Sequence, residues 1–283
     1  MHGTCLSLCP RFERYRRERE NNLFPWETLP PPHQKHVDHS KAVKAYERAA
    51  GDKTLPSDLR PPRVLVGVLD YLFGELMVRE GFERVFGFVR DRTRAVRSDF
   101  TMQHERGKEA VECHERCVRF HVLALHEMRG GKEFSVSLEE QQLMNTLQSL
   151  KEFYTDQRST YTSPNELEMR IYHALIHIRD QRDRSDDVPR EIREGKVYQL
   201  VREFRKRVQV VSAPITKTSR LGVDGEGMRV FGELVGELRR GGGKKGMIFL
   251  VACILEHLFG EETVEDMESV RAGLGLREII DGV

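Results

Sequence analysis

Apolar residues recur at spacings of three and four along most of this 283-residue chain. Leu65, Leu69, Leu72 and Leu76 form one such set, which at 3.6 residues per turn lies on one face of a helix. Further stripes are Leu143, Leu147, Leu150 and Tyr154, then Leu167, Ile171, Leu175 and Ile178. No segment shows the alternation that is typical of a strand. The sequence therefore predicts an all-α fold, an irregular helical-repeat solenoid of amphipathic helices that cover each other's apolar stripes.

Helix start and stop signals divide the chain into segments. Pro61 and Pro62 suit the first turn of a helix, where a proline removes no helical hydrogen bond. Capping-box spacing predicts two more helix starts, at Ser137 with Glu140 and at Ser163 with Glu166. The other expected helices cover 38–50, 82–97, 107–128, 188–208 and two stretches separated by the glycines 241–243, with a loop over 211–227.

Composition limits the class of protein. Lys plus Arg (46) nearly balances Asp plus Glu (45), which argues against a nucleic-acid module with a basic excess throughout the domain. Five scattered cysteines favour a reducing compartment over a disulfide framework. The N-terminus has no apolar core of a signal peptide, and the longest apolar run, Met247 to Leu255, is too short for a bilayer. We expect a soluble intracellular protein.

Two cysteine groups are candidate metal ligands. Cys5 and Cys9 would be half of a zinc site with distant ligands, or else a small apolar packing element. Cys113, Cys117 and His121 share one helix face, but a fourth ligand is missing unless the poorly angled His114 serves. Their apolar neighbours favour ordinary core, so we predict no metal site and no cofactor.

Charged residues are densest in the segment Arg90-Asp91-Arg92-Thr93-Arg94 and its continuation to Gln103. Interleaved apolar residues indicate that this helix is partly buried and that its charges pair with each other. We therefore predict a structural ion network of Arg90, Asp91, Arg94, Arg97 and Asp99, with a grip on a phosphate backbone as the alternative.

More exposed basic runs lie elsewhere in the chain. Arg14, Arg16 and Arg17 are candidate nucleic-acid contacts, and a second basic run covers 202–207. Glutamates are interspersed in both runs, as they are on solvated helix faces. The GGGKKG run at 241–246 lacks the strand and the Ser or Thr of a phosphate loop. No nucleophile, base and oxyanion-hole set is apparent, so no catalytic residue is predicted.

Six blocks in order resemble the SAC/GANP family, the leucine permease transcriptional regulator-like proteins. The first is the opening GTCLSLCPRFERYRRERE, and the next three are VKAYERAAG, LPSDLRPPRVL and VRDRTRAVRSDFTMQ. ERCVRFHVLAL and EEQQLMNTLQSLKEFY complete the series. The resemblance is dense from Gly3 to Tyr154 and thinner up to Phe259, and six blocks in order are far more specific than one.

The resemblance implies a non-enzymatic scaffold, similar to the PCI-type architecture, of the second nuclear transcription-and-export (TREX) complex. The implied partners are a PCI-domain protein and a small acidic DSS-type subunit, with centrin and an ENY-type protein on a later region and RNA bound through the complex. The implied location is the nucleus and its pores, with room for a cytoplasmic pool. No membrane or small-molecule substrate is expected. The alternatives are a short homologue that acts in centrosome duplication and spindle assembly, and a PCI-like subunit in splicing or transcription elongation.

The same comparison predicts the domain organisation. Residues 1–37 form a conserved N-terminal segment with a short basic helix and a proline-rich linker, and 38–260 form the helical-repeat domain. Residues 261–283 are expected to be a short tail, too short for the winged helix that usually ends the family's scaffold.

Overall fold

The computed structural model describes residues 1–282 except 49–53, 181–186, 217–218, 242–243 and 261–262. Over these residues the protein is helical and has no strand, since the only β-type pairing is an isolated antiparallel bridge between Thr28 and Val37. The prediction of an all-α fold is confirmed, and helices that follow one another pack together as in a helical-repeat solenoid. In the part of the chain described, no helix is both long and apolar enough to cross a bilayer.

Two compact units make up the chain, Met1–Cys113 and His114–Val283, and the boundary falls within helix α5 (Lys108–Glu127). The first unit contains α1 (Arg11–Arg19), η1 (Pro25–Glu27), η3 (Pro56–Asp58), α2 (Pro62–Leu69), η4 (Asp70–Leu76), α3 (Met77–Glu80) and α4 (Phe82–Gln103). The second contains α6 (Val136–Gln157), α7 (Glu166–Ile176), α8 (Arg190–Arg193), α9 (Lys196–Val211), α10 (Gly225–Arg240), α11 (Lys245–Phe259), α12 (Met267–Arg271) and α13 (Leu276–Asp281). The predicted boundaries at 37/38 and 260/261 stay predictions.

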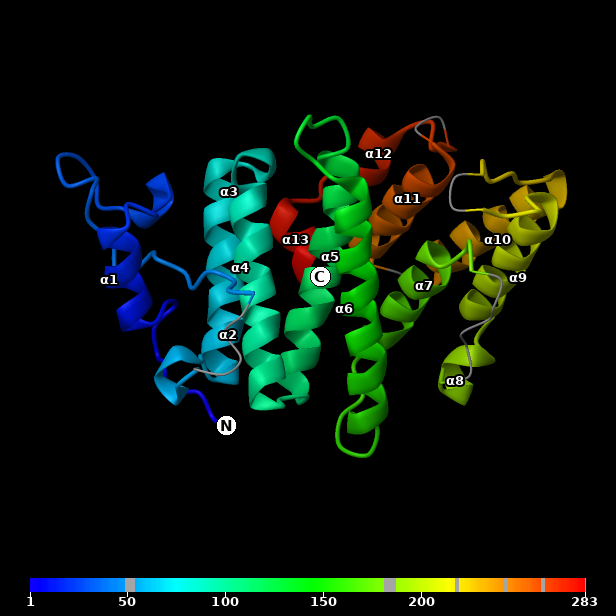
Figure 1. Ribbon diagram of the computed structural model, residues 1–283. Helices are drawn as coiled ribbons and strands as arrows, with labels where there is room; N and C mark the ends of the chain where they lie inside the picture. Colours follow the sequence, from blue (N-terminus) through cyan, green and yellow to red (C-terminus); the bar gives the residue numbers. More distant parts are fainter. Residues whose placement is uncertain (49–53, 181–186, 217–218, 242–243, 261–262, 283) are drawn as a thin grey trace. The chain divides into compact units, whose positions relative to one another are not determined.

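In the first unit, α2, η4 and α3 form one continuous helix that packs along α4 (Figure 1). Leu65, Leu69, Leu72 and Leu76 are all fully buried, so the predicted stripe is the inner face of this helix. Its middle part, η4, is π-helical, and the N–H of Met77 donates to the carbonyl of Leu72, five residues earlier. The apolar spacing alone gave no sign of this widened turn.

The helix expected over 38–50 is wrong for its described residues, 38–48, which form turns and an extended stretch. The helix does not continue because the N–H groups of residues 43–46 bind acceptors from distant parts of the unit, described below. The predicted end at Gly51 lies outside the described residues. Long-range polar contacts here override a local helix propensity, which is a weak preference for any one segment.

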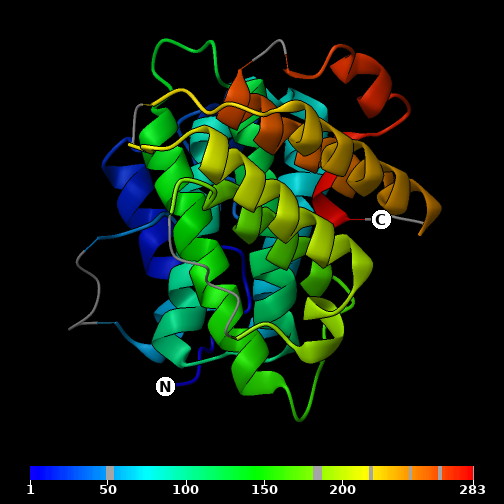
Figure 2. The ribbon, with the colours of Figure 1, turned by 90° about the vertical axis from the view of Figure 1, so that its right-hand side faces the viewer.

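In the second unit, α9 and α10 lie side by side (Figures 1 and 2), and α7 packs against α6, α9 and α11. The core includes the predicted residues Leu143, Leu147, Leu150 and Tyr154, together with Ile171, Leu175 and Ile178. Leu167 is only half-buried. Helix α11 is buried almost throughout, as its apolar sequence predicts.

Three predicted helix boundaries in this unit change. Helix α6 begins two residues earlier than expected, because the hydroxyl of Ser135 rather than Ser137 accepts the N–H of Leu138. The helix expected over 188–208 is split into α8 and α9, since Gly195 leaves the helical conformation with ψ of 138°. Glycine has a low helix propensity, which favours the break at this position.

The hydroxyl of Ser163 accepts the N–H of Asn165, and α7 then starts at Glu166. The carboxylate of Glu166 does not reach back to complete a capping box, because it pairs with Arg158 and Arg170.

Residues 263–282, which belong to the predicted short tail, include the helices α12 and α13. Ile279 and Ile280 of α13 are fully buried, and both α12 and α13 pack against α11. Arg119 binds the end of α13, with its Nη1 atom 3.3 Å from the carbonyl oxygen of Ile280. The end of the chain is thus part of the core of the second unit.

Candidate functional site

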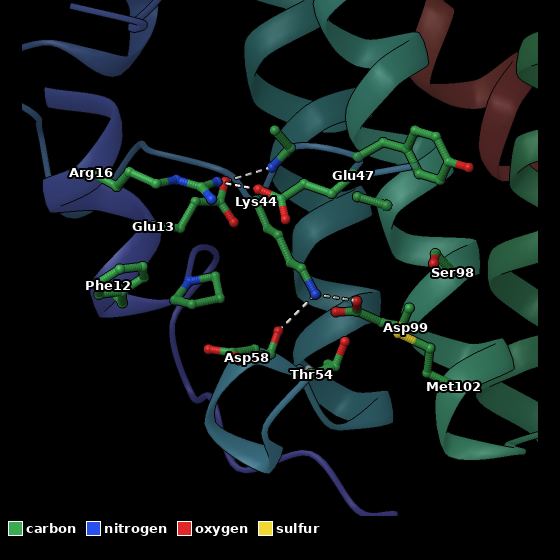
Figure 3. Close-up of a pocket in the computed structure, with 14 residues that line it drawn as sticks. Phe12, Glu13, Arg16, Lys44, Glu47, Thr54, Asp58, Ser98, Asp99 and Met102 are labelled. Atoms are coloured by element: carbon green, nitrogen blue, oxygen red, sulfur yellow. Dashed lines mark hydrogen bonds and ion pairs between the residues drawn. The ribbon is translucent and has the colours of Figure 1, made fainter. Parts of the chain in front are cut away.

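The first unit contains a pocket of about 390 Å³ between α1, η3, α4 and the extended residues 44–47 (Figure 3). Its ionisable lining residues are Glu13, Arg16, Lys44, Glu47, Asp58 and Asp99. Pro10, Phe12, Ala95 and Met102 supply apolar walls. Every wall comes from the four N-terminal sequence blocks that carry the family resemblance or from residues between them, which makes this pocket the candidate site.

Side-chain carboxylates hold the extended segment 42–47 in place. Three of its N–H groups donate to a carboxylate, and the N–H of Lys44 donates to the carbonyl of Leu8 at 3.1 Å. The carboxylate pairs are Val43 with Glu27 (3.0 Å), Ala45 with Glu13 (2.8 Å) and Tyr46 with Asp91 (3.1 Å). Buried backbone groups need partners, and this segment finds them without a neighbouring strand.

Asp99 on α4 is the centre of one buried ion network. Its carboxylate accepts hydrogen bonds from Lys44 Nζ (2.6 Å) and Arg60 Nε (2.7 Å). Lys44 Nζ also donates to the carbonyl of Asp58 at 2.7 Å, and Gln103 Nε2 donates to the carbonyl of Arg60 at 2.8 Å. The network ties the floor of the pocket to α4.

Gly3 links the opening of the chain to this network. Its N–H donates to Oε1 of Gln103 at 2.8 Å. A Cβ at this position would lie 2.5 Å from the carbonyl oxygen of Leu59, closer than two non-bonded atoms can approach. The glycine of the opening GTC block is therefore required by this close backbone contact.

Glu27 is the centre of a second network, and its side chain is completely buried. Arg17 binds it in the bidentate fork, at 2.8 and 3.0 Å, and Arg92 Nη2 lies at 3.2 Å. The guanidinium of Arg92 also lies 4.4 Å from the centre of the Phe88 ring. Charge-assisted bonds in a fork geometry fix orientation as well as energy, so η1, α1 and α4 are held in one arrangement.

The residues of the predicted ion network occupy different environments. Asp99 and Asp91 bind cations, but these are Lys44, Arg60 and Arg92 rather than the predicted Arg94 or Arg97. The guanidinium of Arg94 lies over the ring of Tyr46, 4.0 Å from its centre. Arg90 and Arg97 are half-buried on α4, where their carbonyls accept the hydroxyls of Thr93 and Thr101.

The three candidate nucleic-acid arginines do not share a surface. Arg17 is only 2% exposed and is bound by Glu27, so its assignment to a surface contact needs correction. Arg16 pairs with Glu47 at the pocket, and this hydrogen bond raises the pKa of Arg16. Arg14 donates to the carbonyl of His39 at 3.0 Å. A helix periodicity of 3.6 puts Arg17 on the same face as Glu13, which is the buried face.

The cysteines are all buried and unbridged. Cys9 accepts a long hydrogen bond from Arg17 Nη2 (3.6 Å), and burial raises the pKa of its thiol to about 12. Cys113 and Cys117 lie in the core, and Nδ1 of His121 lies 2.6 Å from Oε1 of Glu139. Among the described residues, no group of three or more His, Cys, Asp or Glu has metal-site geometry.

Buried carboxylates also occur in the second unit. Glu168 on α7 accepts two hydrogen bonds from Arg119 (2.7 and 2.8 Å) and one from the hydroxyl of Tyr172 (2.8 Å). Glu115 on α5 accepts hydrogen bonds from the hydroxyl of Tyr154 and from Ser163 and Asn165, and burial raises its pKa. These groups join helices to one another, and they do not line the pocket of the first unit.

Sequence reasoning missed Glu13, Glu27, Lys44 and Arg60 as site residues. The available signal was the i,i+4 spacing of Glu13 and Arg17, in which Glu13 Oε1 lies 3.2 Å from Arg17 Nε. No local pattern identifies Glu27 or Arg60 as network residues, because their charged partners lie 10 to 65 residues away in the sequence.

Comparisons of the sequence with known proteins agree on one family. A sequence model described as the SAC3/GANP family matches residues 8–274. Over 183 residues, 63% of this chain, the sequence is 46% identical to SAC3 family protein 1 of Schizosaccharomyces pombe. It is also 33% identical to SAC3 family protein B of Arabidopsis thaliana over 186 residues, which are 62% of this chain. It is 31% identical to Protein xmas of Drosophila melanogaster over 190 residues, which are 63% of this chain. These matches cover 18%, 11% and 9% of the three relatives, so the chain spans less than a fifth of their length.

Proposed function

Because this chain belongs to the SAC3/GANP family, we propose that it is a non-enzymatic scaffold of a nuclear complex that exports messenger RNA. The family match over residues 8–274 carries this proposal, since it spans both compact units. In this role the chain would help to couple transcription to export at nuclear pores.

The structural arrangement supports a binding role. Among the described residues that line the pocket, Lys44 pairs with Asp99 and Arg16 pairs with Glu47, and the contacts identified among them do not join a nucleophile to an adjacent base. Buried ion networks fix long non-helical segments on α4, which gives a rigid, irregular surface. Rigid surfaces of this kind suit assembly because little conformational entropy is lost on binding.

The proposed partners are a PCI-domain protein and a small acidic DSS-type subunit, with RNA bound through the assembled complex. The proposed location is the nucleus, including its pores. Affinity purification of the tagged 283-residue chain from nuclear extract tests the partners. We expect mass spectrometry to identify both proteins in near-equal amounts, and their absence would refute the proposal.

Two variants accompany this purification, one as a control and one as a disruptive test. Glu226→Ala removes an exposed ion pair with Arg229 and should retrieve the same proteins. Glu27→Ala removes the centre of a buried network and should retrieve much less. Microscopy of the tagged protein adds an independent outcome, because staining of the nuclear rim fits export whereas staining of spindle poles contradicts it.

A further inference from the structure

Helix α1 is amphipathic in the opposite sense to an ordinary surface helix, which turns its apolar residues inward. The residues that it buries are the charged Glu13 and Arg17, whose side chains form an ion pair at 3.2 Å. Its aromatic residues, Phe12 and Tyr15, are instead 74% and 48% exposed. A single exposed apolar side chain is common, but two rings one helical turn apart form a patch. The outer side of α1 is therefore a candidate binding surface.

The outer side of α1 brings these rings and several charged side chains together. At 100° per residue, half of the helix circumference is occupied in turn by Arg11, Tyr15, Arg19, Phe12, Arg16 and Glu20. All of these residues except Arg11 line one hollow of about 420 Å³, which we call the α1 hollow. The guanidinium of Arg11 lies beside it, 5.9 Å from the centre of the Tyr15 ring.

The positive charge at the α1 hollow is incompletely balanced. Among the described residues, neither Arg19 nor Arg11 makes an ion pair with a carboxylate. Arg16 pairs with Glu47, but the two side chains are partly exposed, at 36% and 43%. An exposed pair of this kind contributes little free energy, so Arg16 can exchange Glu47 for another anion at little cost. The α1 hollow thus offers cations to an anionic ligand.

Exposed rings with cations beside them are the elements of a site for single-stranded nucleic acid. Bases of any sequence stack on flat rings, and arginines bind the phosphates between the bases. An acidic peptide would supply carboxylates without a regular series of planar groups, whereas every nucleotide carries both a base and a phosphate. In a duplex the faces of the bases are already stacked on each other. The combination of groups on α1 therefore favours a single strand.

The carboxylate of Glu20 favours RNA over DNA. Glu20 is exposed, and within the described residues its side chain makes no hydrogen bond or ion pair. A carboxylate repels a phosphate, but it accepts a hydrogen bond from a hydroxyl group. The ribose 2′-hydroxyl is the donor that RNA has and DNA lacks. An acceptor among the cations of the α1 hollow therefore suits the sugar of an RNA strand.

We propose that the α1 hollow binds single-stranded RNA, with two successive bases stacked on Phe12 and Tyr15. Arg11, Arg16 and Arg19 bind the phosphates, and a ribose hydroxyl donates to the carboxylate of the hollow. The proposed export function brings RNA to this chain only through an assembled complex, so a direct contact through α1 goes beyond it.

Fluorescence anisotropy of the 283-residue chain with a fluorescein-labelled uridine dodecamer tests the proposal. We expect saturable binding that weakens with salt, with a slope of log K against log salt of about −1.4 to −2.1 for two to three bound phosphates. The deoxyuridine dodecamer, which lacks only the 2′-hydroxyls, should bind about threefold or more weakly. Equal binding of the two strands would overturn the assignment to RNA. A glutamate dodecapeptide should not bind, and if it binds as well as the RNA, the surface is a protein site and the proposal is wrong.

Variants of the two rings locate the site. Phe12→Ala and Tyr15→Ala should each weaken RNA binding about fivefold or more, as expected when a stacking ring is removed. Tyr15→Phe keeps the ring and should bind like the unaltered chain. Both positions are exposed, so we expect these changes to leave the fold in place. Unchanged affinity in both alanine variants would overturn the proposal.

Variants of the charged residues separate the site from general attraction to a basic protein. Arg19→Ala should weaken binding and reduce the salt slope by about 0.7. Its matched control, Arg193→Ala, removes an exposed arginine of α8 and should change neither quantity. Equal losses in these two variants would contradict the proposal. Glu20→Ala should bring the affinities for the uridine and deoxyuridine strands together, and an unchanged ratio would refute the role of this carboxylate.

The outcome of the RNA experiment is independent of the proposed export function. It uses the isolated chain, whereas the export function is tested by retrieval of a PCI-domain protein from nuclear extract. Absence of RNA binding would therefore overturn the α1 site alone.

Discussion

Buried carboxylates in the two units bind different kinds of group. In the first unit, Glu13 and Glu27 accept backbone N–H groups of the extended segment 42–47. In the second unit, Glu115 and Glu168 accept hydrogen bonds only from side chains, which belong to other helices, to the turn before α7 and, in the case of Tyr172, to the same helix as Glu168. The two buried carboxylates of the second unit bind no backbone N–H group, whereas the extended segment 42–47 of the first unit relies on buried carboxylates for part of its backbone hydrogen bonds.

This difference separates two ways of fixing a chain. Apolar stripes are non-directional, and they hold helices that are already complete as hydrogen-bonded units. An extended segment in the interior must instead be met by acceptors at defined positions. We therefore infer that charge removal alters the path of the chain in the first unit, whereas in the second it weakens the attachment of one helix to another.

The largest effect is expected for Glu27→Ala. The change leaves Arg17 and Arg92 buried without their shared partner and leaves the N–H of Val43 without an acceptor. We expect the free energy of unfolding to fall by about 3–5 kcal/mol, as when one partner of a buried ion pair is removed. Urea unfolding measures this change, and Glu226→Ala at an exposed pair should stay within about 0.5 kcal/mol. A loss below 1 kcal/mol for Glu27→Ala would contradict the comparison.

The next effect concerns Glu168→Gln in the second unit. The amide keeps one acceptor for Arg119 or Tyr172 but loses the charge and the bidentate geometry. We expect a loss of about 2–3 kcal/mol, typical of hydrogen bonds to charged groups. Amide hydrogen exchange sharpens the comparison, because exchange at Val43 and Ala45 should accelerate selectively in Glu27→Ala and not in Glu168→Gln. Equal local acceleration in both variants would argue against it.

A smaller effect is expected for Asp224→Ala, at the start of α10. Asp224 accepts the N–H of Gly227 at 2.7 Å and is the N-cap of this helix. Loss of such a cap typically lowers stability by about 1 kcal/mol. Thermal and urea unfolding should both register the change, and Asp224→Asn, which keeps an acceptor, should restore most of it. Failure of Asn to restore stability would show that the cap is not the reason.

The smallest expected effects are two opposite changes with pH. Burial raises the pKa of Glu13 in the folded state above its ordinary value of 4.5. Between pH 4.5 and this raised pKa, the folded state therefore binds more protons than the unfolded state. Stability therefore falls as the pH rises through this window. A hydrogen bond from His257 lowers the pKa of Glu140, whose stabilising contribution is present above pH 4.5 and is lost as the pH falls through its folded pKa.

Urea unfolding at a series of pH values measures both slopes. Glu13→Gln should abolish the loss of stability that accompanies a rise in pH, and Glu140→Gln should abolish the loss of stability that accompanies a fall in pH. If both variants changed the pH dependence of the unfolding free energy in the same direction, the assignment of burial to Glu13 and of hydrogen bonding to Glu140 would be refuted.

Most of the helices could be predicted from the sequence because their determinants are local. The Leu65–Leu76 stripe, the first-turn prolines and the glycines 241–243 each act over a few residues, and each prediction holds for the described residues. The segment 38–48 could not be predicted in this way. Its conformation is set by Glu13, Glu27 and Asp91, and no periodicity in the segment itself records those partners.

The pocket was harder to foresee than the fold. Asp99 was recognised as part of an ion network, but its partners Lys44 and Arg60 lie 55 and 39 residues away. Charge density on α4 indicated that salt bridges exist without indicating which cation meets which carboxylate. Arg17 shows the opposite error, since a basic run suggested an exposed surface whereas the helix turns this residue inward.

The π-helical segment η4 also affects how the length of this chain can vary. Tyr71, Leu72 and Phe73 are three consecutive buried side chains of this segment, and a π-helical turn holds about one residue more than an α-helical turn. A deletion of one residue inside an α-helix turns every later side chain by about 100° about the axis. A deletion within η4 can instead be absorbed when the wide turn becomes an α-helical one. We therefore expect related sequences to tolerate a one-residue gap here, with Met77 and the following residues still facing α4.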